Sequence, residues 1–179
     1  MEAQELTDLI RRHAGLIHKI AYAYCRDATD REEVVQEVAL QLWRSRLRYD
    51  ERYRETTWVY RIALNVAISF QRRERRHRER RLALDEQAIT IAAASTSEGD
   101  AGPGEDVELL LRCVDDLGAL DKALVLLFLD GNDHASIADV LGISVSNVGT
   151  KLWRIKDRLR VAFEERARSE RKEEPHATR

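Results

Sequence analysis

The chain has few of the residues that build disulfide frameworks, and it lacks membrane spans and signal peptides. Its two cysteines, Cys25 and Cys113, lie far apart and have no CxxC neighbour, so neither a disulfide framework nor a cysteine-based zinc site is expected. Residues 1–5 lack the basic start and apolar run of a signal peptide, and no stretch approaches the length of a membrane span. We therefore expect a soluble, cytoplasmic protein.

Patterns typical of enzymes are also missing. No clustered carboxylates suit a pair of metal ions, no glycine-rich loop suits a phosphate, and no histidine lies near a candidate nucleophile. His13 and His18 could join Cys25 around a metal, but positions on the surface or in the core are the favoured interpretation. The sequence therefore predicts no catalytic residue, no cofactor and no metal, although an active site assembled from distant residues would escape this test.

Proline is scarce as well, and the remaining composition is typical of helices. Two prolines among 179 residues, with 44% hydrophobic and 35% charged residues, predict a mostly helical chain. The charges are segregated: the net charge is −3 over residues 1–40, +8 over 44–81, −9 over 82–121 and +2 over 122–179. Since salt screens surface charges beyond about 8–10 Å, a chain of net charge −2 can still present local basic surfaces to DNA.

A helix-turn-helix is predicted between Asp121 and Arg160. Residues 134–141 have apolar side chains at helical spacing, Gly142 suits a left-handed C-cap, and Ser144 suits the N-cap of the next helix. The apolar seam of that second helix consists of Val145, Val148, Leu152, Ile155 and Leu159. Its opposite face carries groups that pair with base edges and phosphates in a major groove, namely Ser146, Asn147, Thr150, Lys151 and Arg154. The alternative is an ordinary solvated amphipathic helix beside a short turn.

A segment rich in small and acidic residues divides the chain. Residues 95–106 contain one proline, four acids and no large apolar side chain, which is typical of a linker. We expect an all-α fold of two small helical domains joined by a flexible linker, the C-terminal domain being a helix-turn-helix. The expected bounds are 1–84 for the first domain, 85–106 for the acidic linker, 107–162 for the second domain and 163–179 for a charged tail.

The first domain should begin with two helices. The spacing of the apolar residues predicts a helix over Leu6–Tyr24, and Asp30 suits the cap of a second helix that runs to about Arg46. The core stripe of this second helix consists of Val34, Val35, Val38 and Leu42. Its other side carries Glu33, Gln36, Glu37 and Gln41. Acidic residues near a helix start stabilise it against the macrodipole, but Glu37 lies deeper and needs another reason.

An aromatic and arginine-rich segment follows. In residues 48–56, Tyr49 and Tyr53 lie among arginines, which suits the stacking of a splayed single-stranded base, although loop tyrosines also occur without this role. Thr57 suits the cap of a third helix, whose expected buried residues are Trp58, Ile62, Val66 and Phe70. Another face of that helix carries Arg61, Asn65, Ser69 and Arg72. Residues 71–81 hold seven arginines and two glutamates, which favours forked phosphate contacts over a merely solvated helix end.

Three motifs of the first domain and the helix-turn-helix occur in a specific order. The motifs are DREEVVQEV at residues 30–38, LWR at 42–44 and TWVYRIALNVA at 57–67, and the helix-turn-helix follows over residues 131–159. In this order and spacing they resemble the extracytoplasmic-function (ECF) group of bacterial RNA polymerase sigma factors. The resemblance covers nearly the whole chain outside the linker and the tail after about Ala162.

The resemblance implies an alternative sigma factor, which binds core RNA polymerase, contacts the minus-ten and minus-thirty-five promoter elements, helps to melt the DNA and catalyses no reaction. The residues that match the polymerase-binding helix, which faces the clamp helices of the largest subunit, are Asp30, Glu33, Gln36 and Glu37. Those that match minus-ten contacts are Tyr49, Tyr53, Trp58, Arg61, Asn65, Ser69, Arg72 and Arg73. Those that match minus-thirty-five contacts are Ser144, Ser146, Asn147, Thr150, Lys151 and Arg154.

The same resemblance implies the partners. They are core polymerase through its clamp helices and flap, promoter DNA, and an anti-sigma factor, which in many members is membrane-bound; direct membrane insertion of this chain is not expected. The acidic stretch over residues 82–121 suits either an electrostatic mimic of RNA in the polymerase cleft or a solvated tether.

Two residues depart from the family pattern. Ser69 stands where many members have Asp, which puts the identity of the upstream base in question. Gly149 stands where many have Lys or Arg in the recognition helix, so a phosphate contact is lost, and a glycine there costs about 1 kcal/mol of helix propensity relative to alanine. A glycine would also allow close approach of the helix backbone to DNA.

A stand-alone regulator with an N-terminal sensor or dimerisation domain is the alternative function. Such a protein needs a ligand pocket or a dimer seam in its first domain. The sequence there has instead an acidic helix face, an aromatic loop and an arginine-rich helix, and this pattern favours the sigma factor.

Overall fold

The structure is a computed structural model that describes residues 2–50, 52–84, 114 and 117–173. Within these ranges the regular structure is helical and there is no strand, which confirms the predicted all-α class. The predicted acidic linker and Cys113 lie outside the described residues.

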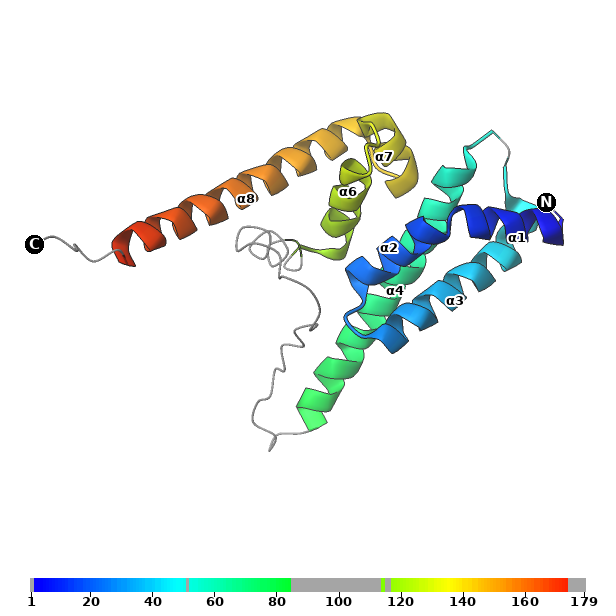
Figure 1. Ribbon diagram of the computed structural model, residues 1–179, viewed down its shortest axis with the longest axis horizontal. Coiled ribbons are helices and arrows are strands. Elements are labelled where there is room, and N and C mark those ends of the chain that lie inside the picture. Colours follow the sequence, from blue (N-terminus) through cyan, green and yellow to red (C-terminus); the bar gives the residue numbers. More distant parts are fainter. Residues whose placement is uncertain (1, 51, 85–113, 115–116, 174–179) are drawn as a thin grey trace, which may run out of the picture.

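The first block, residues 2–84, is a bundle of helices (Figure 1). Its elements are α1 (Ala3–Arg12), α2 (Ala14–Tyr24), α3 (Ala28–Ser45), the short 3₁₀ turn η1 (Arg46–Arg48) and α4 (Glu55–Leu84). Helices α2, α3 and α4 pack together because each carries a stripe of apolar residues on one face. Of the predicted α3 stripe, Val34, Val38 and Leu42 are buried and Val35 is half-buried.

Three predicted helix boundaries in this block are wrong. The helix expected over Leu6–Tyr24 is broken at His13, which has φ −103° and ψ 10°, and Gly15 just beyond it weakens a continuous helix there. Helix α3 starts after Asp27, not Asp30, and its first turn contains Asp30, where an acid also favours the macrodipole. Helix α4 starts at Glu55, so Thr57 lies in its first turn.

The second block contains the predicted helix-turn-helix. Its helices are α6 (Ala119–Leu129), α7 (His134–Leu141) and α8 (Val145–Glu173). Gly142 has φ 66° and ends α7 in the left-handed conformation, and the backbone N–H of Asn147 donates to the Ser144 hydroxyl at 3.2 Å. Both predicted caps are therefore confirmed. Asp133 caps α7 by accepting from the N–H of Ser136 at 2.7 Å, and this bond lowers the pKa of its carboxyl group.

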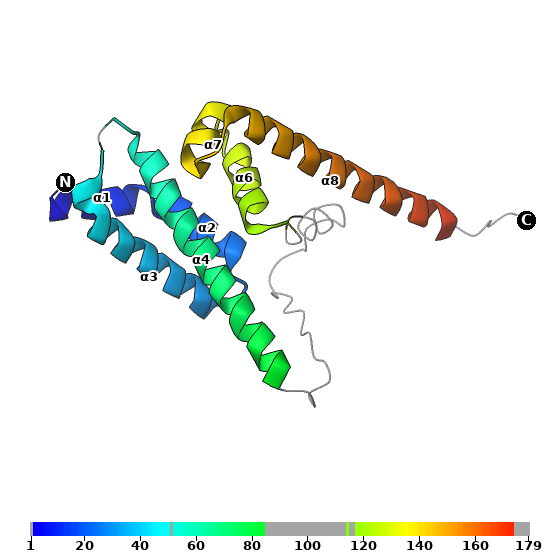
Figure 2. The same cartoon turned by 180° about the vertical axis from the view of Figure 1, so that it is seen from behind.

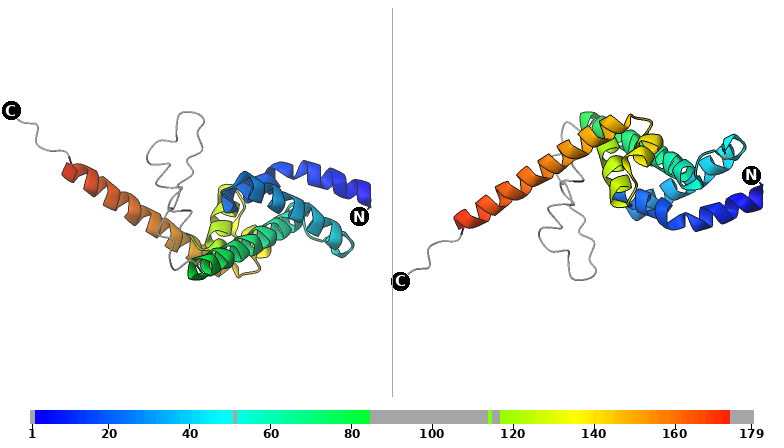
Figure 3. Two further views of the ribbon diagram at one scale, coloured as in Figure 1. Left: turned by 90° about the horizontal axis from the view of Figure 1, so that it is seen from below. Right: turned by 90° about the horizontal axis from the view of Figure 1, so that it is seen from above.

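Helix α8 extends well beyond the predicted helix-turn-helix. Its 29 residues correspond to about 43 Å at a rise of about 1.5 Å per residue. The helix continues to Glu173, past residue 163, where the tail was predicted to begin, and its far end projects away from the other helices (Figure 3).

The turn at Gly142 makes a testable contribution to stability. We expect Gly142→Ala to lower the free energy of unfolding by about 1–2 kcal/mol, because an L-residue is strained in the left-handed region. The matched control is Gly15→Ala in α2, where a Cβ would meet nothing within 4 Å and where alanine should stabilise the helix by about 0.5–1 kcal/mol. Urea denaturation of both variants checks the prediction, and two changes of the same sign would contradict it.

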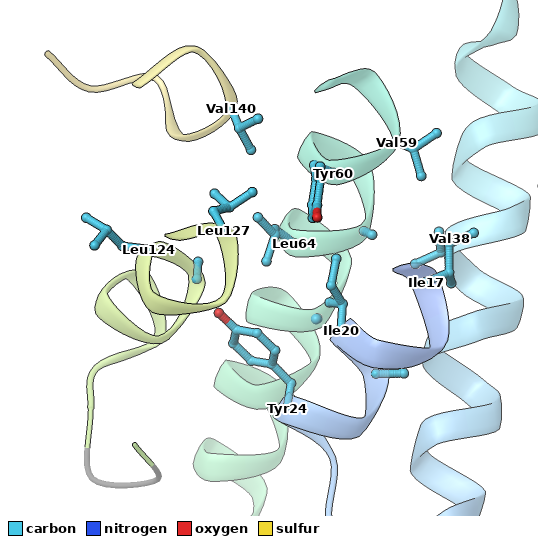
Figure 4. Close-up of a cluster of buried hydrophobic side chains, with 14 of the residues drawn as sticks. Ile17, Ile20, Tyr24, Val38, Val59, Tyr60, Leu64, Leu124, Leu127 and Val140 are labelled. Carbon is cyan, nitrogen blue, oxygen red and sulfur yellow. The ribbon is translucent and has the colours of Figure 1, made fainter. Parts of the chain in front are cut away.

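The two blocks lie against each other. Helices α6 and α7 both contact α4, and Figures 1 and 2 show them alongside it from opposite sides. Their buried apolar residues form one continuous cluster, in which Leu64 of the first block lies beside Leu127 of the second (Figure 4). The described residues thus form a closed arrangement of the two helical blocks.

Candidate nucleic-acid interface

The start of α8 presents most of the predicted recognition residues to solvent. Ser146, Asn147, Thr150 and Arg154 are exposed, and the Thr150 hydroxyl donates to the Ser146 carbonyl at 3.0 Å. Lys151 differs, because its ammonium group binds the Asp121 carboxylate of α6 at 2.7 Å. Of the six residues predicted on this surface, Ser144 serves as the helix cap and Lys151 is held against the neighbouring helix.

A groove runs between α3 and α4. It has a volume of about 590 Å³ and is lined by Glu33, Glu37, Gln41, Ser45, Ile62, Asn65, Val66, Ser69, Phe70 and Arg73. Two predicted groups meet here, since Glu33 and Glu37 belong to the polymerase-binding set and Asn65, Ser69 and Arg73 to the minus-ten set. One ion pair links them directly, between the Arg73 guanidinium and the Glu33 carboxylate at 2.5 Å. The structure therefore brings together two surfaces that the sequence assigned to separate ligands.

The edges of this groove carry the other predicted charges. Asp30 lies half-buried in the first turn of α3, where burial, and next the nearby Asp27, raise the pKa of its carboxyl group. Gln36 and Arg72 are exposed. Arg75, Arg76, Arg78 and Arg80 are also exposed, and Arg75 pairs with Glu79 at 2.8 Å. This end of α4 is a strongly basic, solvated helix.

The predicted aromatic loop is partly packed. The rings of Tyr49 and Trp58 lie 4.9 Å apart at 44°, and the Tyr49 hydroxyl donates to the Tyr53 carbonyl at 3.0 Å. Tyr53 is 44% exposed, and the Arg61 guanidinium carbon lies 5.0 Å from its ring centroid. Tyr53 is thus the more accessible of the two tyrosines, while Tyr49 fixes the loop against α4.

Arg61 also contacts the second block. Its guanidinium donates to the carbonyl of Asp139 in α7, from Nε at 2.9 Å and from Nη2 at 2.5 Å. These bonds direct a predicted minus-ten residue toward the helix-turn-helix. In the closed arrangement, Arg61 is therefore engaged within the protein.

Four further side chains join the blocks, and we call them the latch: Lys19, Tyr24, Tyr60 and Lys122. Lys19 and the Tyr60 hydroxyl both donate to the Asp130 carboxylate at the end of α6. The Tyr24 hydroxyl donates to the Ala119 carbonyl at 2.7 Å, and Figure 4 shows its ring directed from α2 toward α6.

Burial keeps the latch hydroxyl groups protonated. It raises the pKa of Tyr24 and of Tyr60 well above the usual tyrosine range, and for Tyr60 the hydrogen bond to Asp130 adds to the effect. Lys122 is only 3% exposed, and its ammonium group donates to the Ala23 carbonyl at the end of α2 at 3.2 Å. Both hydroxyl groups therefore remain donors across the blocks even at an alkaline pH at which an exposed tyrosine begins to ionise.

Comparison with known proteins identifies the family of this chain. Residues 9–77 match the family model of sigma-70 region 2, and residues 108–159 match that of sigma-70 region 4. These two models describe successive parts of one family, and together they cover more than half of the chain. The chain belongs to the ECF group of sigma factors. This confirms the resemblance found in the sequence, and sigma factors of this kind direct promoter-specific transcription initiation.

Several relatives are similar over most of this sigma factor. The ECF sigma factor SigE of Mycolicibacterium smegmatis is 25% identical over 86% of this chain and 59% of its own length, so this chain spans less than two thirds of SigE. CnrH of Cupriavidus metallidurans is 27% identical over 84% of this chain and 82% of its own. SigV of Bacillus subtilis is 24% identical over 87% of this chain and 89% of its own.

Two solved structures have the same fold. One is the sigma factor RpoE of Bartonella quintana in complex with the anti-sigma factor NepR, with a TM-score of 0.64, 17% identity, and coverage of 90% of this chain and 95% of that chain. The other is CnrH in complex with the cytosolic domain of CnrY, with a TM-score of 0.64, 21% identity, and coverage of 92% of this chain and 90% of that chain.

Sequence reasoning missed two groups of residues in this sigma factor. The first comprises the latch and its acceptor Asp130. The local signal for it was Lys122, the one basic residue in a helix over residues 119–129 that is apolar apart from Lys122 and Asp121. The second comprises exposed apolar side chains on predicted binding helices, namely Leu40, Trp43 and Leu47 near the end of α3 and Trp153 on α8. The sequence signal for these exposed side chains is an apolar residue within an otherwise polar stripe of a helix.

The described residues offer neither a cluster of metal ligands nor a helix that could cross a membrane. Among them, no three His, Cys, Asp or Glu side chains gather in a way that could hold a metal ion. Cys25 is buried, and burial raises the pKa of its thiol to about 11, which disfavours the reactive thiolate. No described helix is both long and apolar enough to cross a membrane.

Proposed function

We propose that this sigma factor holds core polymerase through α3, binds the minus-ten element through α4 and the loop before it, and binds the minus-thirty-five element through α7 and α8. In this proposal the first domain spans residues 1–84, the acidic linker 85–106, the second domain 107–162 and a charged tail the remainder. The observation that carries the proposal is the presence of two separate polar surfaces on one chain, the α3–α4 groove and the exposed face of α8.

The α3 surface has the properties of a protein contact. Glu33 and Glu37 present their carboxylates at the groove with side chains 56% and 41% exposed. Further along the same helix, Leu40 and Trp43 are 41% and 42% exposed, and Leu47 in η1 is 81% exposed. Exposed apolar anchors beside charged groups are typical of protein interfaces, which supports polymerase rather than DNA as the partner of this helix.

The α4 surface suits single-stranded DNA. Asn65 and Ser69 are exposed in the groove, Tyr53 offers an accessible ring in the preceding loop, and the basic end of α4 can hold the backbone. Binding energy for an extruded base would offset the lost stacking, on the order of a few kcal/mol. Melting of the promoter would then need no catalytic residue, and we infer that the protein is not an enzyme.

The closed arrangement limits this function. Arg61 can bind DNA only after its guanidinium has left the Asp139 carbonyl, and separation of α4 from α7 would release it. We infer that polymerase binding separates the first block from the second. We further propose a cytoplasmic location and an anti-sigma factor as a partner. This is supported by two similar structures, that of RpoE in complex with the anti-sigma factor NepR and that of CnrH in complex with the cytosolic domain of CnrY.

Reconstitution with core polymerase tests the proposal. The wild-type chain should support promoter-specific initiation from a genomic promoter library, and the stand-alone regulator would instead bind duplex sites without supporting initiation. Initiation by core polymerase with no dependence on the chain, or duplex binding alone, would contradict the sigma function.

Two alanine variants test the division of labour. Arg154→Ala should weaken closed-complex affinity by about 10-fold, because it removes a cation from the duplex-binding face. Asn65→Ala should leave that affinity nearly unchanged and slow open-complex formation by about 10-fold, because it removes a contact in the melted element. Filter binding and permanganate footprinting separate the two steps, and equal effects of both variants on both steps would refute the assignment.

A further inference from the structure

Trp153 is the largest apolar side chain on the exposed face of α8. It is 66% exposed, and within the described residues no aromatic ring or cation stacks on it. It lies three residues after Thr150 and seven after Ser146, spacings that place all three side chains on one face of a helix. An indole therefore lies within the surface proposed to bind the duplex.

A single exposed tryptophan has little meaning alone, since isolated apolar residues are common on protein surfaces. Gly149 provides the second observation. It precedes Trp153 by one helical turn, and helical side chains lean toward the preceding turn. A Cβ at Gly149 would meet only the His134 ring, at 4.0 Å, so packing within the protein does not require a glycine here. A helix-weakening residue thus leaves an open notch beside a large apolar ring.

The major groove of DNA has one apolar feature that fits this pair of residues. The 5-methyl group of thymine projects into the groove and is recognised by apolar side chains, and a glycine lets the helix backbone approach the DNA. We propose that Trp153 is a specificity-determining residue that packs on a thymine methyl group of the minus-thirty-five element, with Gly149 providing the close approach. This inference rests on the proposed function of α8 as a duplex-binding helix.

The test combines a protein change with a DNA change. The minus-thirty-five duplex selected in reconstitution is remade with each thymine replaced in turn by deoxyuridine, which removes only the methyl group. At one position, the wild-type chain should bind the deoxyuridine duplex about 4-fold more weakly, the value expected for one buried methyl. Trp153→Ala should bind the thymine duplex about 10-fold more weakly than wild type and should no longer distinguish the two duplexes.

Further variants separate this role from a structural one. Trp153→Phe should retain part of the discrimination, and Trp153→Ala should leave the salt dependence of binding unchanged, because the indole neutralises no phosphate. Gly149→Ala should raise the urea midpoint of unfolding and yet weaken duplex binding several-fold. Tyr22→Ala is the matched control, since Tyr22 is 64% exposed on α2 and has no role in the proposal.

The outcomes are distinct. If Trp153→Ala and wild type discriminate equally between thymine and deoxyuridine, or if the variant loses initiation while keeping full duplex affinity, the inference is overturned and Trp153 contacts protein or nothing. If the wild-type chain neither initiates nor binds the duplex, the proposed function itself fails. Loss of discrimination in Trp153→Ala alone supports the inference.

Discussion

Glu37→Lys should reduce the affinity of the sigma factor for core polymerase by about 100-fold, since placing like charges in contact across an interface costs several kcal/mol. In the structure, the Glu37 carboxylate accepts from the Gln41 amide at 2.6 Å and has Arg44 3.9 Å away. These groups hold the carboxylate on the α3 face. A lysine there would add a cation beside Arg44 and lose both contacts, while the buried stripe of α3 would stay intact.

Competition against a labelled wild-type chain for core polymerase measures this effect. Glu164→Lys is the control, because it makes the same charge change on an exposed residue of α8 far from α3. Equal affinities of Glu37→Lys and the control would show that α3 does not carry the polymerase contact. Glu33→Lys should behave differently, because it also releases Arg73 from its ion pair, and should therefore alter open-complex formation as well as polymerase binding.

Asp130→Lys should open the closed arrangement. Asp130 receives hydrogen bonds from Lys19 and Tyr60, so a lysine would face the Lys19 ammonium and leave Tyr60 without its acceptor. Like-charge contact of this kind costs several kcal/mol, which corresponds to a shift of about 100-fold or more toward separated regions. Helix α6 itself should persist, because residue 130 is its C-cap and a cation there favours the macrodipole.

Small-angle scattering and an interdomain fluorescence distance report the opening, and DNA binding by the chain without polymerase should increase because Arg61 is released. The double variant Lys19→Asp with Asp130→Lys restores opposite charges and should close the protein again. An unchanged radius of gyration in Asp130→Lys would mean that the latch does not hold the regions together.

Local chemistry explains why parts of this structure could be predicted. The turn between α7 and α8 depends on Gly142 and Ser144, whose conformational and capping preferences act within a few residues. The α3 stripe follows from helical periodicity. By contrast, the break at His13 was missed because the apolar spacing continues across it from α1 into α2, so periodicity alone cannot locate it.

Long-range pairings could not be predicted in the same way. Lys19 and Asp130 are separated by 111 positions and Arg61 and Asp139 by 78, and no periodic pattern relates them. Periodicity assigned Arg61 and Lys151 to exposed binding faces, but the structure engages both in contacts with other helices. A helical pattern identifies a polar face and does not identify which neighbour that face meets.

The buried ammonium group of Lys122 should lower the free-energy cost of opening the closed arrangement. In the closed form, this charge is withdrawn from water and satisfied in part by the last carbonyls of α2, through Ala23, so part of its hydration free energy is lost. When the regions separate, water can solvate both the ammonium and the freed carbonyl, and this gain offsets some of the lost apolar contact. An all-apolar seam would have no such compensation. Separation of the blocks should therefore leave neither the Lys122 ammonium group nor the Ala23 carbonyl without a hydrogen-bond partner.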